Sequence, residues 1–188
     1  RKDHFAFLAE LRKHSEVTGA SLLLDDLAAR TRDRTSTFAA LAGPEWIARL
    51  ARIVADLGPH ADTIHLCLTH GDFTPWNTFF QRGRLYVFDW EYARVDWPVG
   101  FDLAHFLLST TPSADQPGRL PTLIQTLAEA QFDGDTKRAA RALLLSLACH
   151  ALFYLSRLQE ADSPLESWAE GPMRAVLIDQ LLDNEAIS

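Results

Sequence analysis

Cysteine is scarce in this chain, with two residues among 188. Cys67 lies within the mostly apolar run Ile64–Leu68, and Cys149 lies within Leu147–Ala151. A thiol in such surroundings is usually a small core residue. The two cysteines therefore argue against a disulfide framework and against a cysteine-based metal site, and they fit a reducing compartment. Because no signal peptide is visible either, we expect a cytoplasmic protein.

Basic blocks and long hydrophobic runs are also missing. The formal net charge is −7, so the chain lacks the positive surface that would release counterions from a nucleic acid or bind an anionic membrane. The most apolar uncharged run, Ala142–Ser156, is bounded by Arg141 and Arg157, whereas a bilayer needs about 20 apolar residues. The sequence thus predicts a buried helix in this run, and neither a nucleic acid nor a membrane as partner.

The rest of the composition is that of a globular protein. Hydrophobic residues make up 47% of the chain and charged residues 23%, which is typical of a packed core and not of a disordered chain. A length of 188 residues suits one domain or most of one. We therefore expect residues 1–188 to form a single domain.

Helical periodicity surrounds a short β-rich centre. Apolar residues at helical spacing predict helices over about residues 2–14, 45–57, 101–109, 119–130, 136–159 and 172–182. Gly43-Pro44 is the expected start of the second helix, and Gly58-Pro59 is its expected stop. The apolar run 20–27 fits a helix or a loop. Helix 136–159 is apolar nearly all round, which indicates a position in the middle of its domain.

Two β-rich runs lie between these helices. Thr78–Phe80 and Leu85–Phe88 are separated by Gln81–Arg84, a turn sequence that contains a glycine. This pattern predicts a hairpin. The expected fold class is therefore mainly α with a small β-hairpin, an α+β protein.

The residues that indicate chemistry surround this hairpin. Asp72, Asn77 and Asp89 are separated by five and twelve positions, within the stretches THGDFTPWN and VFDWEY. Phosphoryl transfer from a nucleotide needs one carboxylate to orient a substrate hydroxyl, plus an amide oxygen and a second carboxylate to hold Mg²⁺. The hairpin would fold the chain back so that Asn77 and Asp89 share one ion.

These stretches resemble the catalytic and metal-binding loops of the aminoglycoside phosphotransferase and choline kinase superfamily of small-molecule kinases. In that superfamily, His-Gly-Asp-x-x-x-x-Asn is followed by Phe-Asp-Trp-Glu. The resemblance implies a protein-kinase-like C-terminal lobe, with the catalytic and metal-binding loops at residues 63–92. It implies ATP and Mg²⁺ as cofactors and Asp72 as the catalytic base. Asn77 and Asp89 would hold the metal and, through it, the nucleotide; one amide and one carboxylate suffice for Mg²⁺.

Four neighbouring residues receive lesser roles. The resemblance makes His70 a brace of the catalytic loop. Asp102, near the start of helix 101–109, either supports that loop through backbone hydrogen bonds or caps its own helix. Glu91 is either a secondary metal or substrate contact or a solvated carboxylate. Trp97 is a candidate for stacking on a substrate cation, with core packing as the alternative.

Two other interpretations of the motif, a transition-metal site and a protein kinase, fit less well. A transition-metal cluster of His65, His70, Asp72 and Asp89 is disfavoured, since the two histidines lack the i, i+4 spacing of a helical site. A protein kinase is disfavoured because Gly71 stands where His-Arg-Asp has its arginine.

The phosphate clamp of a kinase, a glycine-rich loop with a strand lysine and a helix glutamate, would precede the catalytic loop. Residues 1–62 are too few for that lobe and are helical in pattern, so we expect an N-terminal lobe upstream of Arg1. The expected function is ATP- and Mg²⁺-dependent phosphorylation of a small-molecule hydroxyl. The alternative is a truncated, catalytically incomplete kinase-like binding or regulatory module. A cationic substrate is favoured slightly by the acidic C-terminal region, which holds Glu160, Asp162, Glu166, Glu170 and also Trp168.

Overall fold

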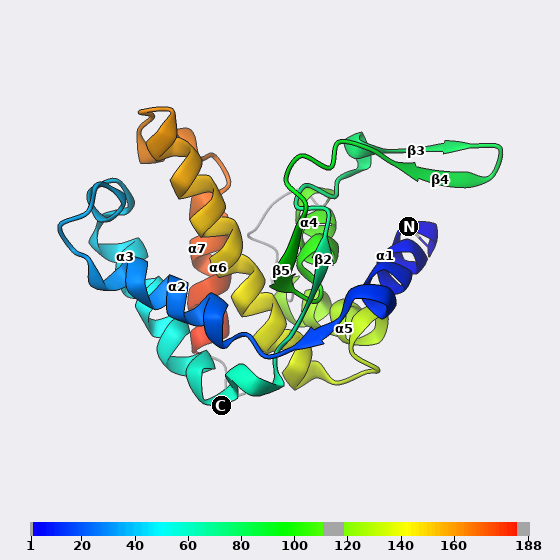
Figure 1. The fold of residues 1–188 in the computed structure, drawn as a ribbon, viewed down its shortest axis with the longest axis horizontal. Helices are drawn as coiled ribbons and strands as arrows, with labels where there is room; N and C mark the ends of the chain where they lie inside the picture. The colour runs from blue at the N-terminus through cyan, green and yellow to red at the C-terminus, as the bar shows by residue number, and fades with distance from the viewer. Residues whose placement is uncertain (1, 111–118, 184–188) are drawn as a thin grey trace.

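The computed structural model describes residues 2–110 and 119–183 (Figure 1). Its helices are α1 (Lys2–Ser15), α2 (Ser21–Arg32), α3 (Thr37–Leu57), α4 (Phe101–Thr110), α5 (Arg119–Gln131), α6 (Thr136–Glu160) and α7 (Gly171–Leu182). Its strands are β1 (Val17–Thr18), β2 (His65–Thr69), β3 (Thr78–Gln81), β4 (Arg84–Val87) and β5 (Arg94–Pro98). Short 3-10 turns are η1 (Gly58–Thr63), η2 (Pro75–Asn77) and η3 (Leu165–Ser167). The protein is mainly helical with small antiparallel sheets, which agrees with the predicted α+β class.

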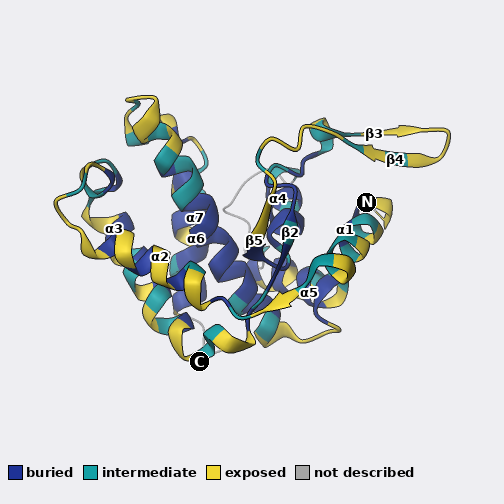
Figure 2. Ribbon diagram, viewed as in Figure 1, coloured by how far each residue is buried: buried dark blue, intermediate teal, exposed yellow. Residues whose placement is uncertain are grey.

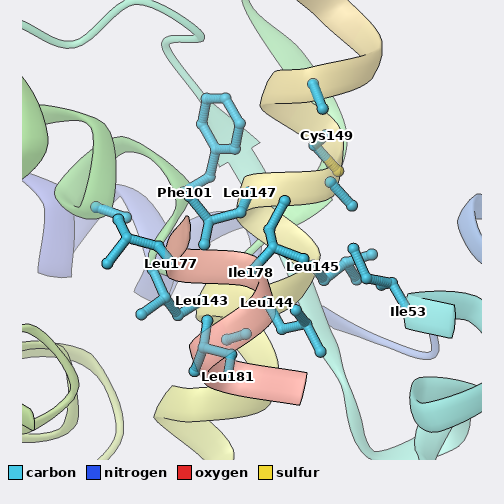
Figure 3. Close-up of a cluster of buried hydrophobic side chains, with 14 of the residues drawn as sticks. Ile53, Phe101, Leu143, Leu144, Leu145, Leu147, Cys149, Leu177, Ile178 and Leu181 are labelled. Atoms are coloured by element: carbon cyan, nitrogen blue, oxygen red, sulfur yellow. The ribbon is translucent and has the colours of Figure 1, made fainter. Parts of the chain in front are cut away.

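Helix α6 is the centre of the hydrophobic core. Nearly every residue from 139 to 151 is buried, and burying a leucine stabilises the fold by about 1.5–3 kcal/mol. Figure 3 shows α6 leucines meeting side chains of α7 and α3, among them Leu143, Leu144, Leu145, Leu147, Leu177, Ile178, Leu181 and Ile53. Asp135 begins the helix, since its carboxylate accepts a hydrogen bond from the backbone N–H of Arg138 at 3.0 Å. The predicted buried helix is thus confirmed.

By length and composition alone, α6 could also cross a membrane, and in the described part of the chain no other helix meets these two criteria. Of its most apolar window, 72% is buried inside the protein.

Helix α3 begins earlier than its apolar pattern predicts. Gly43 has non-helical dihedral angles (φ 74°, ψ 167°) and kinks the helix, and Pro44 follows at the start of the second segment, where a missing N–H is tolerated. The expected helix start is therefore an internal kink, preceded by residues 37–42. Ser36 caps that first segment by accepting a hydrogen bond from the N–H of Ala39 at 3.1 Å. The run 20–27 belongs to helix α2 over most of its length.

A three-stranded antiparallel sheet in the order β1-β2-β5 is absent from the sequence prediction. Strand β1 has only two residues, and β5 carries two charges and ends on a proline, so neither shows the alternation typical of a strand. The pairing of β2 with β5 places Thr69 opposite Arg94. The loop that follows β2 and the loop that precedes β5 therefore lie at the same end of the sheet.

Strands β3 and β4 form the predicted hairpin, in a register that pairs Thr78 with Val87 and Gln81 with Arg84. The hairpin extends away from the helices (Figure 1) and is largely exposed (Figure 2). Phe79 stacks on Tyr86 across the strands, with 5.0 Å between ring centroids. On β3, Thr78 and Phe80 contact His4 of α1, through a hydrogen bond of 3.1 Å and an edge-on ring contact of 5.5 Å. The motif residues Asn77 and Asp89 flank the base of the hairpin.

Candidate active site

Asp102 anchors the loop that follows β2. It lies in the first turn of α4 with 4% of its surface exposed. One carboxylate oxygen accepts the backbone N–H of His70 at 2.6 Å, and the other accepts that of Gly71 at 3.0 Å. Both oxygens are thus used by the loop and not by its own helix. Burial raises the pKa of Asp102 to about 7, which these two hydrogen bonds oppose.

Gly71 lets two segments of the motif pass against each other. Its φ is 87°, and a Cβ at this position would lie 2.8 Å from the carbonyl carbon of Tyr92. A side chain here would therefore strain the backbone and also collide with it. The loop 70–77 and the segment that follows the hairpin can pack together only around glycine.

His70 joins the two halves of the motif. Its buried ring donates a hydrogen bond from Nε2 to the carbonyl oxygen of Phe88 at 2.7 Å, and its Nδ1 accepts the N–H of Asp72 at 3.2 Å. These two partners assign the neutral tautomer that is protonated on Nε2. Burial lowers the pKa of His70 and favours the same neutral form. His70 thus connects the backbone at Asp72 to the residue before Asp89.

The carboxylate of Asp72 is clamped between two donors. His105 Nε2 donates to Oδ1 at 2.9 Å, and Asn77 Nδ2 donates to Oδ2 at 2.9 Å. The hydrogen bond from His105 is the largest cause that lowers the pKa of Asp72, and Asn77 adds to it. The side chain remains 38% exposed, and each oxygen keeps a second lone pair. Asp72 is therefore an ionised, oriented acceptor open to a ligand.

His105 is the site residue that the sequence analysis misses. It lies one helical turn after Asp102 on α4, so both side chains lie on the face of the helix that meets the loop. Asp102 holds the loop backbone there, whereas His105 holds the Asp72 side chain. The signal in the sequence is a histidine three positions after a helix-start aspartate, within an otherwise apolar run.

Asn77 and Asp89 stand at the same end of the hairpin. The N–H of Phe88 donates to the carbonyl oxygen of Asn77 at 3.2 Å, which extends the β3–β4 ladder by one step. The amide nitrogen of Asn77 donates to the Asp72 side chain and, at 2.9 Å, to its backbone carbonyl. Its Oδ1 has no hydrogen-bond partner among residues 2–110 and 119–183.

Asp89 is exposed and has a φ of 66°, a left-handed conformation that aspartate tolerates better than most residues. Its carboxylate makes no hydrogen bond within the described ranges of the chain. Together with Oδ1 of Asn77 it offers a set of oxygen donors only, which is the kind that Mg²⁺ prefers.

The structure separates the histidines of the transition-metal cluster that the sequence analysis disfavours. His65 forms a close hydrogen bond with Glu16 of α1, away from the loop. In the part of the chain that the structure describes, no three His, Cys, Asp or Glu side chains are placed to hold a metal ion.

Trp97 and Glu91 lie outside the constellation around Asp72. Trp97 is buried, packs on Phe101 with ring centroids 4.2 Å apart, and has the guanidinium of Arg94 5.4 Å from its own ring centre. Its aromatic face is therefore already in contact with a cation of the protein. Glu91 is exposed, and its neighbouring carboxylate is the largest cause that raises the pKa of the Tyr92 phenol.

Trp168 and three of the acidic C-terminal residues lie in different environments. Glu160, Asp162 and Glu166 are exposed. Trp168 is buried between Trp46 and Tyr154, with centroid distances of 5.0 and 5.4 Å. Both faces of its ring are therefore covered by aromatic side chains, and neither is available to a substrate cation.

A comparison with protein families places this geometry in context. Residues 5–144 match the model described as the phosphotransferase enzyme family, which is most of the chain. The chain belongs to this phosphotransferase family. The family corresponds to the superfamily of aminoglycoside phosphotransferases and choline kinases that the motif resembles. The matched range contains the whole phosphotransferase motif together with His105. No curated protein and no solved structure matches the chain significantly.

Proposed function

We propose that the protein transfers the γ-phosphoryl group of ATP to a hydroxyl of a small molecule. Membership of the phosphotransferase family supports a phosphoryl transfer. The observation that carries the proposal is the Asp72 carboxylate, which is ionised, fixed by donors from His105 and Asn77, and still partly exposed. A base in this position can accept a hydrogen bond from an acceptor hydroxyl and align it for attack.

The three aspartates of the site differ in environment, and the differences separate their roles. Asp102 is buried and both of its carboxylate oxygens accept hydrogen bonds from the loop backbone, so its role is to position the loop. Asp89 is exposed without a hydrogen-bond partner in the described residues, so it suits a cation together with Asn77. Asp72 lies between these extremes and is the proposed base.

In the proposed reaction the acceptor oxygen forms a bond to the γ-phosphorus while the bond from that phosphorus to the bridging oxygen breaks. ADP leaves with the electron pair, and the proton of the hydroxyl passes to Asp72 and then to solvent. Mg²⁺, when bound, would supply charge neutralisation on the phosphates. Asn77 and Asp89 would hold the ion. The Nδ2 group of Asn77 donates hydrogen bonds to Asp72, which fixes the Asp72 side chain and also orients Oδ1 of Asn77.

We propose further that residues 1–188 form a single domain, the C-terminal lobe of a kinase-like cytoplasmic enzyme, completed by an N-terminal lobe upstream of Arg1. This proposal is supported by five large aromatic side chains that are exposed in this region. Phe79, Phe80 and Tyr86 lie on the hairpin strands, and Trp76 and Phe88 flank the base of the hairpin. Exposed apolar patches of this kind mark contact surfaces. The start of α1 lies on the same side of the molecule as the hairpin (Figure 1). The alternative remains a kinase-like binding module without turnover.

The test is an acceptor screen with the full-length protein, ATP and Mg²⁺. The panel contains amino alcohols, aminoglycosides, sugars and hydroxy acids, and ADP release and product mass are measured. We expect ADP release that depends on one acceptor class and stops when EDTA removes the metal. Ligand binding without ADP release for any member of the panel would instead support the binding module.

A further inference from the structure

Several buried side chains behind Asp72 have polar atoms without a hydrogen-bond partner among the described residues. The unpartnered atoms are Nδ1 of His105, both ring nitrogens of His150, Nε and Nη1 of Arg174, and Nε1 of Trp168. These four residues, the buried polar cluster, are 3%, 1%, 1% and 4% exposed. An unsatisfied buried polar group costs about 1–3 kcal/mol, and native proteins contain few of them. Their concentration in one region therefore calls for a ligand.

The cluster is continuous with the proposed base. His105 Nε2 binds Asp72, and the ring of His105 lies 4.6 Å from that of His150 on α6, measured between centroids. His150 is followed by Tyr154 at 6.3 Å, and Tyr154 by Trp168 at 5.4 Å. Burial is the main cause that lowers the pKa of His150, and the positive charge of Arg174, which is itself buried on α7, lowers it further.

The free groups of the cluster are mainly donors. The unpartnered N–H groups of Arg174 and Trp168 can only donate, and a neutral His150 ring adds one N–H and one acceptor nitrogen. The N–H of His105 is already donated to Asp72, so its Nδ1 is an acceptor. Among the described residues, the single ion pair of Arg174 is with Glu170, 3.3 Å from Nη2, and Glu170 is 43% exposed. Burial is the largest cause that lowers the pKa of Arg174. A buried guanidinium stays protonated and needs an acceptor. Within residues 2–110 and 119–183, Nε and Nη1 of Arg174 therefore lack the anionic oxygen acceptors that a guanidinium prefers.

We infer that the buried polar cluster binds the carboxylate or phosphate of the acceptor substrate, and that this substrate is a small hydroxy acid or a phosphorylated alcohol. Arg174 would pair with the anionic group, while the substrate hydroxyl reaches Asp72 past His105. Guanidinium suits carboxylate and phosphate oxygens in geometry as well as charge. The inference rests on the proposed function and replaces the cationic substrate that the acidic residues of the C-terminal region suggest.

Matched acceptor pairs test this inference in the full-length protein. Each hydroxy acid, such as L-serine or D-glycerate, is compared with its primary amide, and each sugar phosphate with its free sugar. We expect kcat/KM at least about 100-fold higher for the anionic member, since a site built to pair with a substrate group strongly rejects analogues that lack it. Preference among acids or among phosphates then identifies the anion. Equal rates within pairs, or a preference for amines, would overturn the inference.

Variants of Arg174 add a second measurement. Arg174→Met should raise KM for the anionic acceptor at least about tenfold and leave the amide unaffected, whereas Arg174→Lys should lose less. Arg52→Met is the matched control, because Arg52 binds the Leu182 carbonyl at the other end of α7, and it should leave the acid-to-amide ratio unchanged. If Arg174→Met does not fold, as judged by circular dichroism, the comparison within wild-type pairs decides alone.

Direct binding separates this inference from the proposed function. Saturation-transfer NMR is recorded for L-serine, D-glycerate and inorganic phosphate on the wild-type protein and Arg174→Met, with ADP present to fill the nucleotide site. Anion binding that Arg174→Met abolishes, without phosphoryl transfer to any acceptor, would keep the anion site and refute the kinase. Turnover of neutral acceptors without anion binding would keep the kinase and refute the anion site. Absence of both would overturn both.

Discussion

His105 and Asp72 form a hydrogen bond of 2.9 Å between Nε2 and Oδ1, from a helix to the loop that the same helix supports. Asp102, one turn earlier on α4, holds the backbone of that loop. Helix α4 therefore fixes both the position of the loop and the orientation of its carboxylate. The proposed base depends on packing inside the helical core as much as on its own motif.

Replacing His105 by Phe should shift the pH dependence of catalysis. The hydrogen bond from His105 is the largest cause that lowers the pKa of Asp72, so its loss raises that pKa. Because the base must be ionised, the acidic limb of the kcat/KM profile should move to higher pH. We also expect kcat to fall about tenfold or more, since a hydrogen bond to a charged group contributes about 1.5–3 kcal/mol.

The control for this prediction is His105→Gln, whose side-chain amide can place an N–H near the position of Nε2. It should return the acidic limb most of the way to that of the wild type. An acidic limb that stays in place in His105→Phe would show that His105 does not act through Asp72.

Asp72→Asn should leave the fold and nucleotide binding intact but reduce turnover about 10²–10⁴-fold, the usual contribution of a general base. Steady-state kinetics with the best acceptor, together with thermal unfolding, measure the two effects separately. The control is Asp96→Asn, which removes an exposed carboxylate whose partner is Arg94, at 2.9 Å. Near-normal turnover in Asp72→Asn would mean that another group takes the proton.

Asp89→Asn should weaken the binding of ADP in the presence of Mg²⁺ and leave the weaker metal-free binding unchanged. Asparagine is chosen because the φ of 66° at this position suits asparagine better than alanine. Isothermal calorimetry with and without Mg²⁺ measures the difference. An unaltered response to Mg²⁺ would place the metal on other residues.

Gly71→Ala should lower the free energy of unfolding by about 2 kcal/mol or more. The left-handed conformation alone costs an alanine about 1–2 kcal/mol, and the added Cβ would also collide with the backbone of Tyr92. Gly83→Ala is the control, since Gly83 has a φ of 74° with nothing within 4 Å of an added Cβ. Urea unfolding of both variants compares them, and equal losses would show that the contact with Tyr92 is unimportant.

The sequence was most informative where chemistry or periodicity is local. Helix α6 and the β3–β4 hairpin follow from apolar spacing and a turn signal, and the motif points to its own family. The sheet β1-β2-β5 does not follow, because the charged strand β5 acquires its conformation by pairing with β2. Propensity carries no information about such a partner.

The interior of the site escapes sequence analysis for a similar reason. His105 and His150 lie in apolar helical runs where a histidine is indistinguishable from a satisfied core residue. Arg174 resembles any arginine near a helix start. Only the packing of α4, α6 and α7 brings these side chains behind Asp72 and leaves several of their polar atoms unpartnered within the described part of the chain.

The neutral ring of His70 has a consequence for how the site assembles. Its Nδ1 accepts from Asp72 while its Nε2 donates to the residue before Asp89. A second proton on this ring would direct an N–H at the N–H of Asp72, so one bond could not persist. The loop that carries Asp72 and the end of the hairpin that carries Asp89 are therefore positioned together or displaced together. The imidazole of His70 thus couples the position of the proposed base, Asp72, to the position of the proposed metal ligand, Asp89.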